Sequence, residues 1–148
     1  MSAPRPLTIT GGQLVLPGMP PVPGSLRCEG GLIRAIGGAI PGPDDLVVDA
    51  RGALIAPGLV DLGVFAIDKP ACHFGGITRA ALMPDQNVVL DKPSSVRFAA
   101  QSGKPDLWVH PLAAATKGLE GRELAELAMM REAGARAVAP GRRWVADS

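Results

Sequence analysis

The stretch Leu54–Asp68, LIAPGLVDLGVFAID, decides how the rest of the sequence is interpreted. After the Pro57-Gly58 turn comes an apolar run, LVDLGVF, with the length and composition of a buried strand. Short strand patterns separated by glycine and proline precede this run, and longer strand and helix patterns follow it. The sequence therefore predicts two parts, an N-terminal part at residues 1–58 and a second part at residues 59–148.

The N-terminal part predicts short strands joined by turns. PLTIT and QLVLPG flank the Gly11-Gly12 pair, and a loop rich in proline and glycine follows. Next come SLRCEG, GLIRAIGG, LVVDARG and ALIAPG, each bounded by glycine or proline. In residues 32–36, apolar side chains alternate between two faces, which favours a strand over a helix. We expect a small antiparallel β-subdomain.

In the second part of the sequence, strand patterns alternate with helix patterns. The strand patterns are GLVDLGVF, GGITRAALMP, PDLWVHPL and ARAVAP. Between them, PSSVRFAAQSG predicts a short helix that Ser94 caps and Gly103 ends. EGRELAELAMMREAG, residues 120–134, has the strongest helical spacing of apolar residues in the chain. Such alternation is typical of a parallel α/β sheet.

Composition limits the classes of function. The 148 residues are 47% hydrophobic and 20% charged, and the net charge is +1 with both signs interspersed. There is no basic run, and aromatic residues are scarce, so we expect no nucleic-acid partner. No apolar stretch reaches the roughly 18 residues of a membrane span. We expect a cytoplasmic protein that does not bind membranes.

Several residues outside this pattern could in principle bind a metal or an anion, and each has a simpler structural interpretation. Cys28 and Cys72 have no metal-binding spacing, and we expect free thiols with Cys28 buried. Cys72 and His73 would point apart on an extended segment, which disfavours a shared metal. His110, near a strand end, suits a hydrogen-bonded core or rim histidine. The basic segment at residues 141–144, GRRW, is either a phosphate or carboxylate site or a solvent-facing loop.

Five collinear segments carry a resemblance to a known family. They are VVDARGALIAPGLVDLGV, GGITRAALMPD, LDKP, HPLAAATKGLEGRELAE and GARAVAPGRRWVADS. In this order they resemble the N-terminal part of dihydroorotases and related cyclic amidohydrolases. The resemblance implies an α/β fold, the N-terminal part of an amidohydrolase (β/α)8 barrel preceded by the β-subdomain. A complete barrel takes about 250 residues, so we expect a fragment of a longer chain. Only residues 66–74 separate the first two barrel strands, which predicts that a crossover helix is lost.

The resemblance also implies where the family's functional residues would fall. These are two metal-binding histidines, a substrate-contacting arginine and asparagine, a metal-bridging aspartate and a neighbouring acidic residue. They fall, in chain order, on Gly63, Phe65, Ile67, Asp85, Pro140 and Gly141. The family would imply zinc, but glycine, phenylalanine and proline side chains cannot ligate a metal. We therefore expect no catalytic residue and no cofactor, and an Asp85 carboxylate that repels anionic substrates.

Two functions remain open. The first is a non-catalytic dihydroorotase-like protein of pyrimidine biosynthesis that assembles with aspartate carbamoyltransferase, as degenerate copies in this family do. The alternative is an active zinc-dependent cyclic amidohydrolase that opens dihydroorotate or a hydantoin-like ring. Its ligands would come from the rest of a longer chain, or from Asp61, His73 and Asp85. By itself, the chain of 148 residues would form an open sheet with unpaired edges, so we also expect oligomers.

Overall fold

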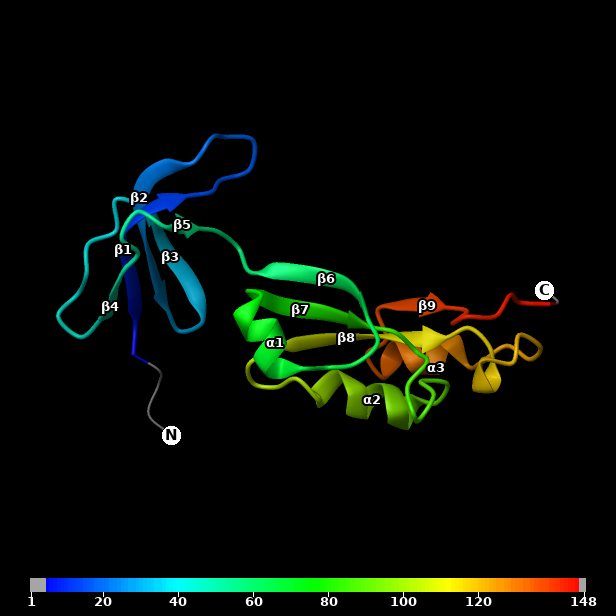
Figure 1. Cartoon of the computed structure of the whole chain (residues 1–148). Helices are drawn as coiled ribbons and strands as arrows, with labels where there is room; N and C mark the ends of the chain where they lie inside the picture. The colour runs from blue at the N-terminus through cyan, green and yellow to red at the C-terminus, as the bar shows by residue number, and fades with distance from the viewer. Residues whose placement is uncertain (1–4, 147–148) are drawn as a thin grey trace. The chain divides into compact units, whose positions relative to one another are not determined.

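Two β-sheets form the framework of residues 5–146, the part of the chain that the computed structural model describes (Figure 1). Each sheet belongs to its own unit. The first unit is Met1–Pro57 and the second is Gly58–Ser148, so the chain passes from one to the other between Pro57 and Gly58.

The first unit is built around strand β1, which pairs with β2, β4 and β5. β1 and β2 are antiparallel, as are β2 and β3, whereas β4 and β5 run parallel to β1. The sheet is therefore mixed, and the expectation of a purely antiparallel subdomain is wrong. Its strands are β1 Leu7–Leu14, β2 Val22–Glu29, β3 Leu32–Gly37, β4 Leu46–Asp49 and β5 Leu54–Ile55.

The Gly11-Gly12 pair forms a bulge inside β1, where the sequence predicts a turn between two strands. The register with β2 shifts between Ile9 and Gly12, and Gly11 has a φ of 65°, which L side chains rarely adopt. Because the bulge lets the strand continue, the first half of β1 pairs with β4 and its end pairs with β5.

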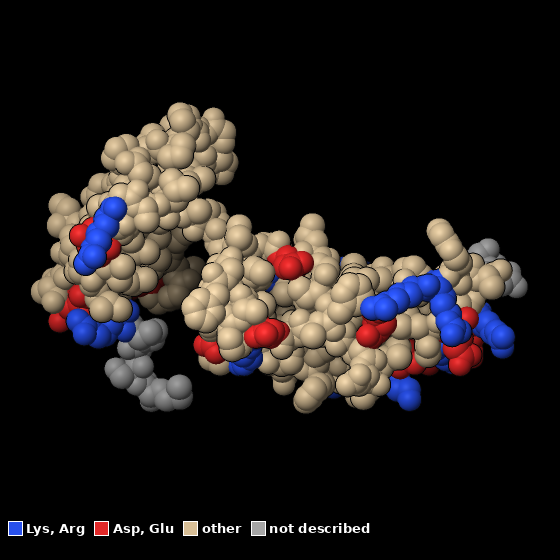
Figure 2. Space-filling view, in the orientation of Figure 1, with Lys and Arg blue, Asp and Glu red and all other residues tan. Residues whose placement is uncertain are grey.

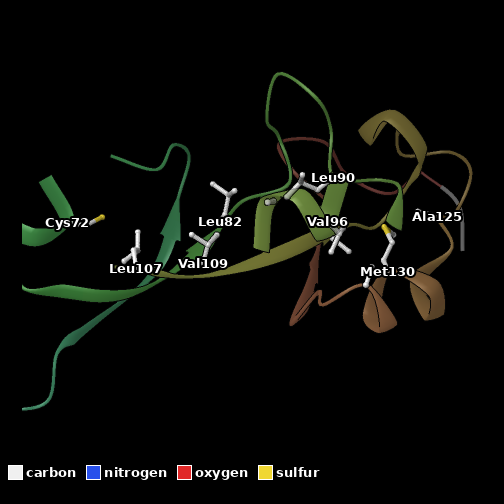
Figure 3. Close-up of a cluster of buried hydrophobic side chains, with 11 residues drawn as sticks. Cys72, Leu82, Leu90, Val96, Leu107, Val109, Ala125 and Met130 are labelled. Carbon is white, nitrogen blue, oxygen red and sulfur yellow. The ribbon is translucent and has the colours of Figure 1, made fainter. Parts of the chain in front are cut away.

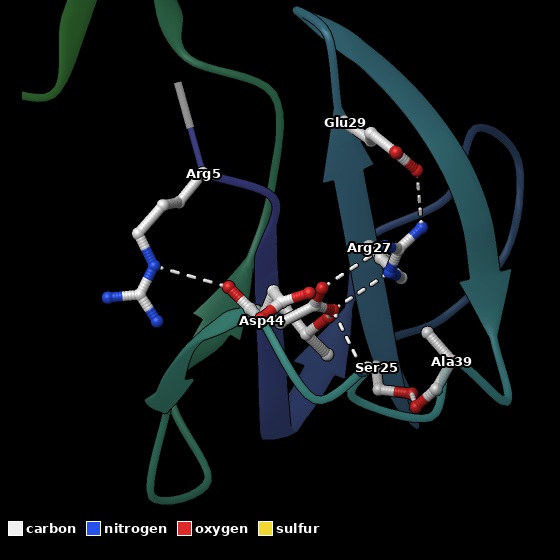
Figure 4. Close-up of polar contacts among 9 residues, drawn as sticks. Arg5, Ser25, Arg27, Glu29, Ala39 and Asp44 are labelled. Carbon is white, nitrogen blue, oxygen red and sulfur yellow. Dashed lines mark hydrogen bonds and ion pairs between the residues drawn. The ribbon is translucent and has the colours of Figure 1, made fainter. Parts of the chain in front are cut away.

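Asp45 is the buried acidic residue of the first unit. Its carboxylate accepts hydrogen bonds from Arg27 Nε at 2.8 Å and Arg27 Nη2 at 3.1 Å. The Thr8 hydroxyl and the Gly42 N–H also donate to it, and Arg27 pairs in addition with Glu29 (Figure 4). The Arg27 guanidinium, followed by these two donors, holds the pKa of Asp45 well below its usual range.

The second unit is a parallel sheet in the order β6-β7-β8-β9, with helices in the connections. Neighbours in space follow the order of the sequence, as in a segment of a barrel. The strands are β6 Leu59–Val64, β7 Ile77–Leu82, β8 Trp108–Ala114 and β9 Ala137–Ala139. The helices are α1 Lys69–Phe74, α2 Pro93–Gln101 and α3 Leu127–Glu132, and a 3-10 turn spans Lys117–Leu119.

The helices cover one face of this parallel sheet (Figure 1). Cys72 from α1, Val96 from α2 and Met130 from α3 join a buried cluster with strand residues such as Leu82 and Val109 (Figure 3). Burying one side chain of this size contributes about 1.5–3 kcal/mol to the free energy of unfolding. The core of the second unit is therefore aliphatic and lies between the helices and the sheet.

The helix predicted at residues 120–134 is much shorter in the structure, where α3 covers only Leu127–Glu132. The preceding residues run beside the end of β8, and the Lys117 N–H donates to the Glu123 carbonyl. Gly121 has a φ of 77°, which is incompatible with a continuing α-helix. Backbone pairing of residues 115–117 with residues 123–125 thus overrides the helical periodicity.

Helix α2 begins at Pro93 with Lys92 as its N-cap residue, so the assignment of Ser94 as the cap is wrong. Pro93 suits the first turn, because an N–H there has no intrahelical acceptor. The C-cap residue is Ser102, one position before the predicted stop at Gly103.

The connection between β6 and β7 keeps a helix, so the predicted loss of the crossover helix is also wrong. The Asp68 side chain caps the six-residue α1 by accepting a hydrogen bond from the Ala71 N–H at 3.0 Å. β6 itself, expected to be buried, is an edge strand of the described sheet. Leu62 on this strand is 80% exposed.

Both cysteines are free thiols. Cys72 is buried, whereas Cys28, which we expected to be buried, is only half-buried in β2. No helix formed by the described residues is long and apolar enough to cross a membrane.

Candidate functional site

Barrel proteins place their sites at the C-terminal ends of the parallel strands. At this edge of the sheet, Phe65 follows β6, Asp85 and Gln86 follow β7, and Arg142 follows β9. Hydrogen bonds and a ring contact connect these residues. We call Phe65, Asp85, Gln86 and Arg142 the strand-end cluster.

Arg142 joins the two positions that the resemblance assigns to metal and substrate binding. Its Nε donates to Asp85 Oδ2 at 3.0 Å, and its guanidinium carbon lies 5.1 Å from the Phe65 ring centroid. The Arg142 side chain is 77% exposed, so the ion pair contributes no more than about 1 kcal/mol. The ion pair therefore matters little for stability. Its main consequence is that a permanent cation lies beside Phe65.

Gln86 fixes the backbone under the cluster. Its Nε2 donates to the Phe65 carbonyl at 3.1 Å and to the Met83 carbonyl at 2.8 Å. These two carbonyls lie at the ends of β6 and β7, so one amide group holds the two strand ends together.

Asp85 is already engaged by the chain itself. Its side chain is 17% exposed, with Oδ2 paired to Arg142 and Oδ1 buried without a partner among residues 5–146. The arginine compensates the negative charge, and the expectation that Asp85 repels an anionic substrate stays a prediction.

Asp61 braces its own strand. Its Oδ1 accepts a hydrogen bond from the Gly63 N–H at 3.0 Å. A Cβ built on Gly63 would have no neighbouring atom within 4 Å. There is therefore room for a Cβ atom at Gly63.

His73 lies at the opposite end of the sheet. Its carbonyl accepts from the Gly76 N–H, and the Gly76 carbonyl accepts from the Leu59 N–H at the start of β6. A six-residue strand is about 20 Å long, so His73 is not brought together with Asp85. His73 is exposed on α1 while its neighbour Cys72 points into the core.

The residues present do not fit the zinc that the family resemblance implies. Gly63, Phe65 and Pro140 have no ligand atom in their side chains, and Asp85 is paired with Arg142. A catalytic zinc requires about three protein ligands. No group of three or more His, Cys, Asp or Glu side chains in the described part of the chain could hold a metal ion.

A cavity of about 690 Å³ opens beside the strand-end cluster, between the ends of β6 and β7 and helix α2. Its walls are mostly apolar and include Phe65, Ile67, Leu82 and Phe98. This size suits a small organic molecule. Ile67 stands where the resemblance implies a substrate-contacting arginine, but it packs against the core and offers no charge.

Arg142 and Arg143 of the basic segment GRRW line a second cavity, of about 340 Å³, together with Asp85 and Glu120. Two arginines and two acidic residues face this space, so their formal charges cancel. The segment thus combines an ion pair with an exposed loop, and it does not favour an anion.

His110 is hydrogen-bonded, as expected for a rim histidine. Arg79 Nη1 lies 3.3 Å from His110 Nε2. Because arginine can only donate, Nε2 must accept, and the ring is neutral. Burial, followed by the positive charges of Arg79, Arg136 and Lys104, lowers the pKa of His110.

Curated proteins with similar sequences are dihydroorotases. The protein from Ruminiclostridium cellulolyticum is 35% identical over 133 residues, which cover 80% of this chain and 31% of that protein. A dihydroorotase-like protein from Pseudomonas putida is 33% identical over 139 residues, covering 83% and 32%. The chain belongs to the dihydroorotase-like amidohydrolases. It spans about a third of the length of these relatives, and no protein-family model matches it.

Solved structures show the same fold for this dihydroorotase-like chain. The L-hydantoinase from Arthrobacter aurescens has a TM-score of 0.70 at 19% identity, covering 87% of this chain and 31% of that one. A dihydroorotase crystal structure has a TM-score of 0.60 at 18% identity, covering 88% and 39%. The fold is thus α/β, a partial (β/α)8 barrel with a β-subdomain, as the sequence predicts.

Sequence reasoning missed the positions of Arg142 and Gln86 in the site. A usable signal exists for Arg142, because GRRW directly follows the fourth barrel strand and so lies at the same edge as the other strand ends. Gln86 follows Asp85 in the MPDQ segment and has no motif of its own.

Proposed function

We propose that the whole protein is a non-catalytic member of the dihydroorotase-like family and an assembly partner of aspartate carbamoyltransferase in pyrimidine biosynthesis. The strand-end cluster carries this proposal. Arg142 pairs with Asp85 and lies against Phe65, where the resemblance implies a metal ligand. A built-in cation at this place disfavours a divalent metal by charge repulsion.

The resemblance to degenerate family copies supports the choice of partner. Such copies hold the carbamoyltransferase assembly together, which requires the fold but not the metal. One relative, from Pseudomonas putida, is itself described as dihydroorotase-like.

Metal content tests the non-catalytic part of the proposal. The protein is incubated with zinc, desalted gently and measured by elemental analysis, and the ring opening of dihydroorotate is assayed in parallel. We expect far less than one zinc per chain and no ring opening. The Ruminiclostridium cellulolyticum dihydroorotase, treated identically, is the positive control. Stoichiometric zinc with turnover would refute this part.

Co-purification tests the assembly part. The protein is co-expressed with the aspartate carbamoyltransferase of the same organism, with an affinity tag on only one of them. We expect a complex that survives size-exclusion chromatography. Separate elution of the two proteins would refute the partnership and leave the metal result standing.

A second function, an active cyclic amidohydrolase, is favoured by Asp61 within β6 and Asp85 just after β7, which remain acidic. It predicts the opening of dihydroorotate or hydantoin when zinc or manganese is supplied. Asp61→Ala would then abolish turnover, whereas Asp106→Ala, at an exposed position before β8, would not. Absence of turnover under all these conditions would refute this second function.

A further inference from the structure

The helix layer of the second unit covers the parallel sheet incompletely at α1. This helix has six residues and is about 9 Å long, whereas β6, also of six residues, is about 20 Å long. The Gly76 carbonyl, just after α1, accepts a hydrogen bond from the Leu59 N–H, so α1 lies near the start of β6. The helix is therefore too short to reach the C-terminal strand ends, and none of its residues lines the cavity there.

The cavity of about 690 Å³ occupies the part of the helix layer that α1 leaves open. Its floor includes Leu82 and Leu90, which belong to the buried core beneath the helices (Figure 3). Its other wall residues come from α2 and from the connections that follow β6 and β7. The cavity therefore lies on the helix side of the sheet, outside the barrel interior. Strands added at the β6 or β9 edge of a longer chain are not needed to form it.

Aromatic side chains rim this cavity. Phe98 of α2 is 79% exposed, and Phe65, just after β6, is 52% exposed. Exposed apolar side chains around a concave site mark ligand-binding grooves. An apolar ligand would remove these rings from water, so the hydrophobic effect favours its binding.

The half-buried polar side chains of the wall accept hydrogen bonds but have no donor to spare. The Ser95 and Ser102 hydroxyls donate to backbone carbonyls of α2 and of the loop before it. Gln86 Nε2 donates to two further carbonyls. Asp85 Oδ1 is buried and has no hydrogen-bond partner among residues 5–146. Because a buried acceptor without a donor is costly, a ligand N–H or O–H beside Asp85 would be stabilised.

The charges around the cavity favour a neutral ligand. No lysine, arginine or histidine of the described chain lines it, so an anion would meet Asp85 without a compensating cation. A cationic ligand would find the Asp85 carboxylate already paired with Arg142. Figure 2 shows acidic side chains singly or near basic ones on the face in view, so no area of one charge gathers there to attract an ionic ligand.

We propose that this cavity, the helix-side cavity, binds a free, neutral aromatic molecule of one or two rings that donates one hydrogen bond to the Asp85 carboxylate. The rings of the ligand contact Phe65 and Phe98, which suit aromatic pairs. The volume is within the range of sites for small organic molecules. This inference goes beyond the proposed function, because it depends neither on the loss of zinc nor on the carbamoyltransferase.

An aromatic side chain from a second copy of the chain is a competing occupant. Phe74 and Trp144 are each 94% exposed and could insert into a neighbouring molecule. One such side chain would fill only part of a cavity of about 690 Å³, and phenylalanine has no donor for Asp85. The free molecule therefore fits better, and the test includes the oligomeric state.

Indole and 1-methylindole test the proposal as a matched pair of probes, because only indole has an N–H donor. Saturation-transfer NMR titrations with the whole protein give the dissociation constant of each probe. Benzoate, an aromatic anion, and dihydroorotate are added as competitors. Size-exclusion chromatography with and without indole measures self-association.

We expect saturable binding of indole that is about fivefold tighter than that of 1-methylindole, with no displacement by benzoate or dihydroorotate. Absence of saturable binding, or equal affinities for the two probes, would overturn the proposal. Displacement by dihydroorotate would also overturn it and assign the cavity to a ring-opening site. A dimer that indole dissociates would overturn it in favour of a side chain from a second copy.

Two pairs of variants locate the binding. Ala66→Trp, at a wall residue, should weaken indole binding at least about tenfold, whereas Ala71→Trp, at an exposed residue of α1 outside the wall, should not. Asp85→Ala should remove the advantage of indole over 1-methylindole. Arg142→Ala should keep it, because that variant breaks the same ion pair but retains the carboxylate. Circular dichroism checks that each variant is folded, and equal effects within either pair would contradict the assignment.

Discussion

At Asp45, one carboxylate ties together separate segments of the first unit. It accepts hydrogen bonds from Thr8 in β1, from Arg27 in β2 and from the Gly42 N–H in the loop before β4. Its pKa is lowered in the folded state, chiefly by Arg27. This contribution to stability is therefore fully present above the unfolded-state pKa of about 3.9 and is lost as the pH falls toward the folded-state value.

Asp45→Asn should lower the melting temperature at neutral pH, because the amide cannot accept the same charged pair from Arg27. The difference from the wild type should shrink as the pH falls from about 5 toward about 2. Thermal unfolding followed by far-UV circular dichroism measures both effects. Asp44→Asn is the control, since Arg5 contacts the backbone of Asp44 and not its carboxylate. The same pH profile in both variants would contradict the assignment.

At the strand-end cluster, the identity of Phe65 can be predicted from the sequence but its contact with Arg142 cannot. The histidine-to-phenylalanine replacement at position 65 can be predicted from the sequence alone, through the family resemblance. The ring's contact with Arg142 cannot, because the two residues lie far apart in the chain and follow strands that are not neighbours in the sheet.

Among the elements, the short helix α3 contributes one buried methionine to the core. Met130 is fully buried and packs in the cluster with Val96 and Leu107, whereas its neighbour Met129 is 53% exposed. The two residues have the same chemistry and differ only in the face of α3 that they occupy.

Met130→Ala should reduce the free energy of unfolding by about 2–5 kcal/mol, because it leaves a cavity in the core. Met129→Ala, its matched control, should change this free energy by no more than about 0.5 kcal/mol. Urea unfolding followed by tryptophan fluorescence suits the measurement, since Trp108 and Trp144 both belong to the second unit. Equal effects of the two substitutions would mean that the α3 register is wrong.

Element types were predictable where the local pattern and the tertiary pairing agree. The strands β6, β7, β8 and β9 follow from apolar runs bounded by glycine and proline, and the structure confirms them. The pattern fails at residues 120–126, which have helical spacing but pair with the backbone after β8. It also fails at Gly11-Gly12, where the same residues suit a turn or a bulge and only the partner strands decide.

At the scale of the whole molecule, the parallel sheet of the second unit exposes an apolar edge strand. β6 forms one end of the described sheet order and exposes Leu59, Val60 and Leu62. Such an edge presents unpaired backbone groups beside apolar side chains, which is a template for association with another chain. Asp61 weakens the template, because its carboxylate already binds the Gly63 N–H.

Leu62→Lys should reduce concentration-dependent self-association of the chain, because a lysine on an edge strand opposes strand pairing. We expect the onset of association to move to at least about tenfold higher protein concentration. Dynamic light scattering over a concentration series measures it. Phe98→Lys, at a residue that is 79% exposed on α2, is the control. If both substitutions act equally, exposed apolar surface in general and not the β6 edge drives association.

The position of β1 in the first sheet also sets the order in which the newborn chain can fold. β1 is made first, yet its parallel partners β4 and β5 begin only at Leu46 and Leu54. At about 5–20 residues per second, translation leaves one side of β1 unpaired for seconds. During this interval, the β1–β2–β3 meander is the part of this sheet that can form.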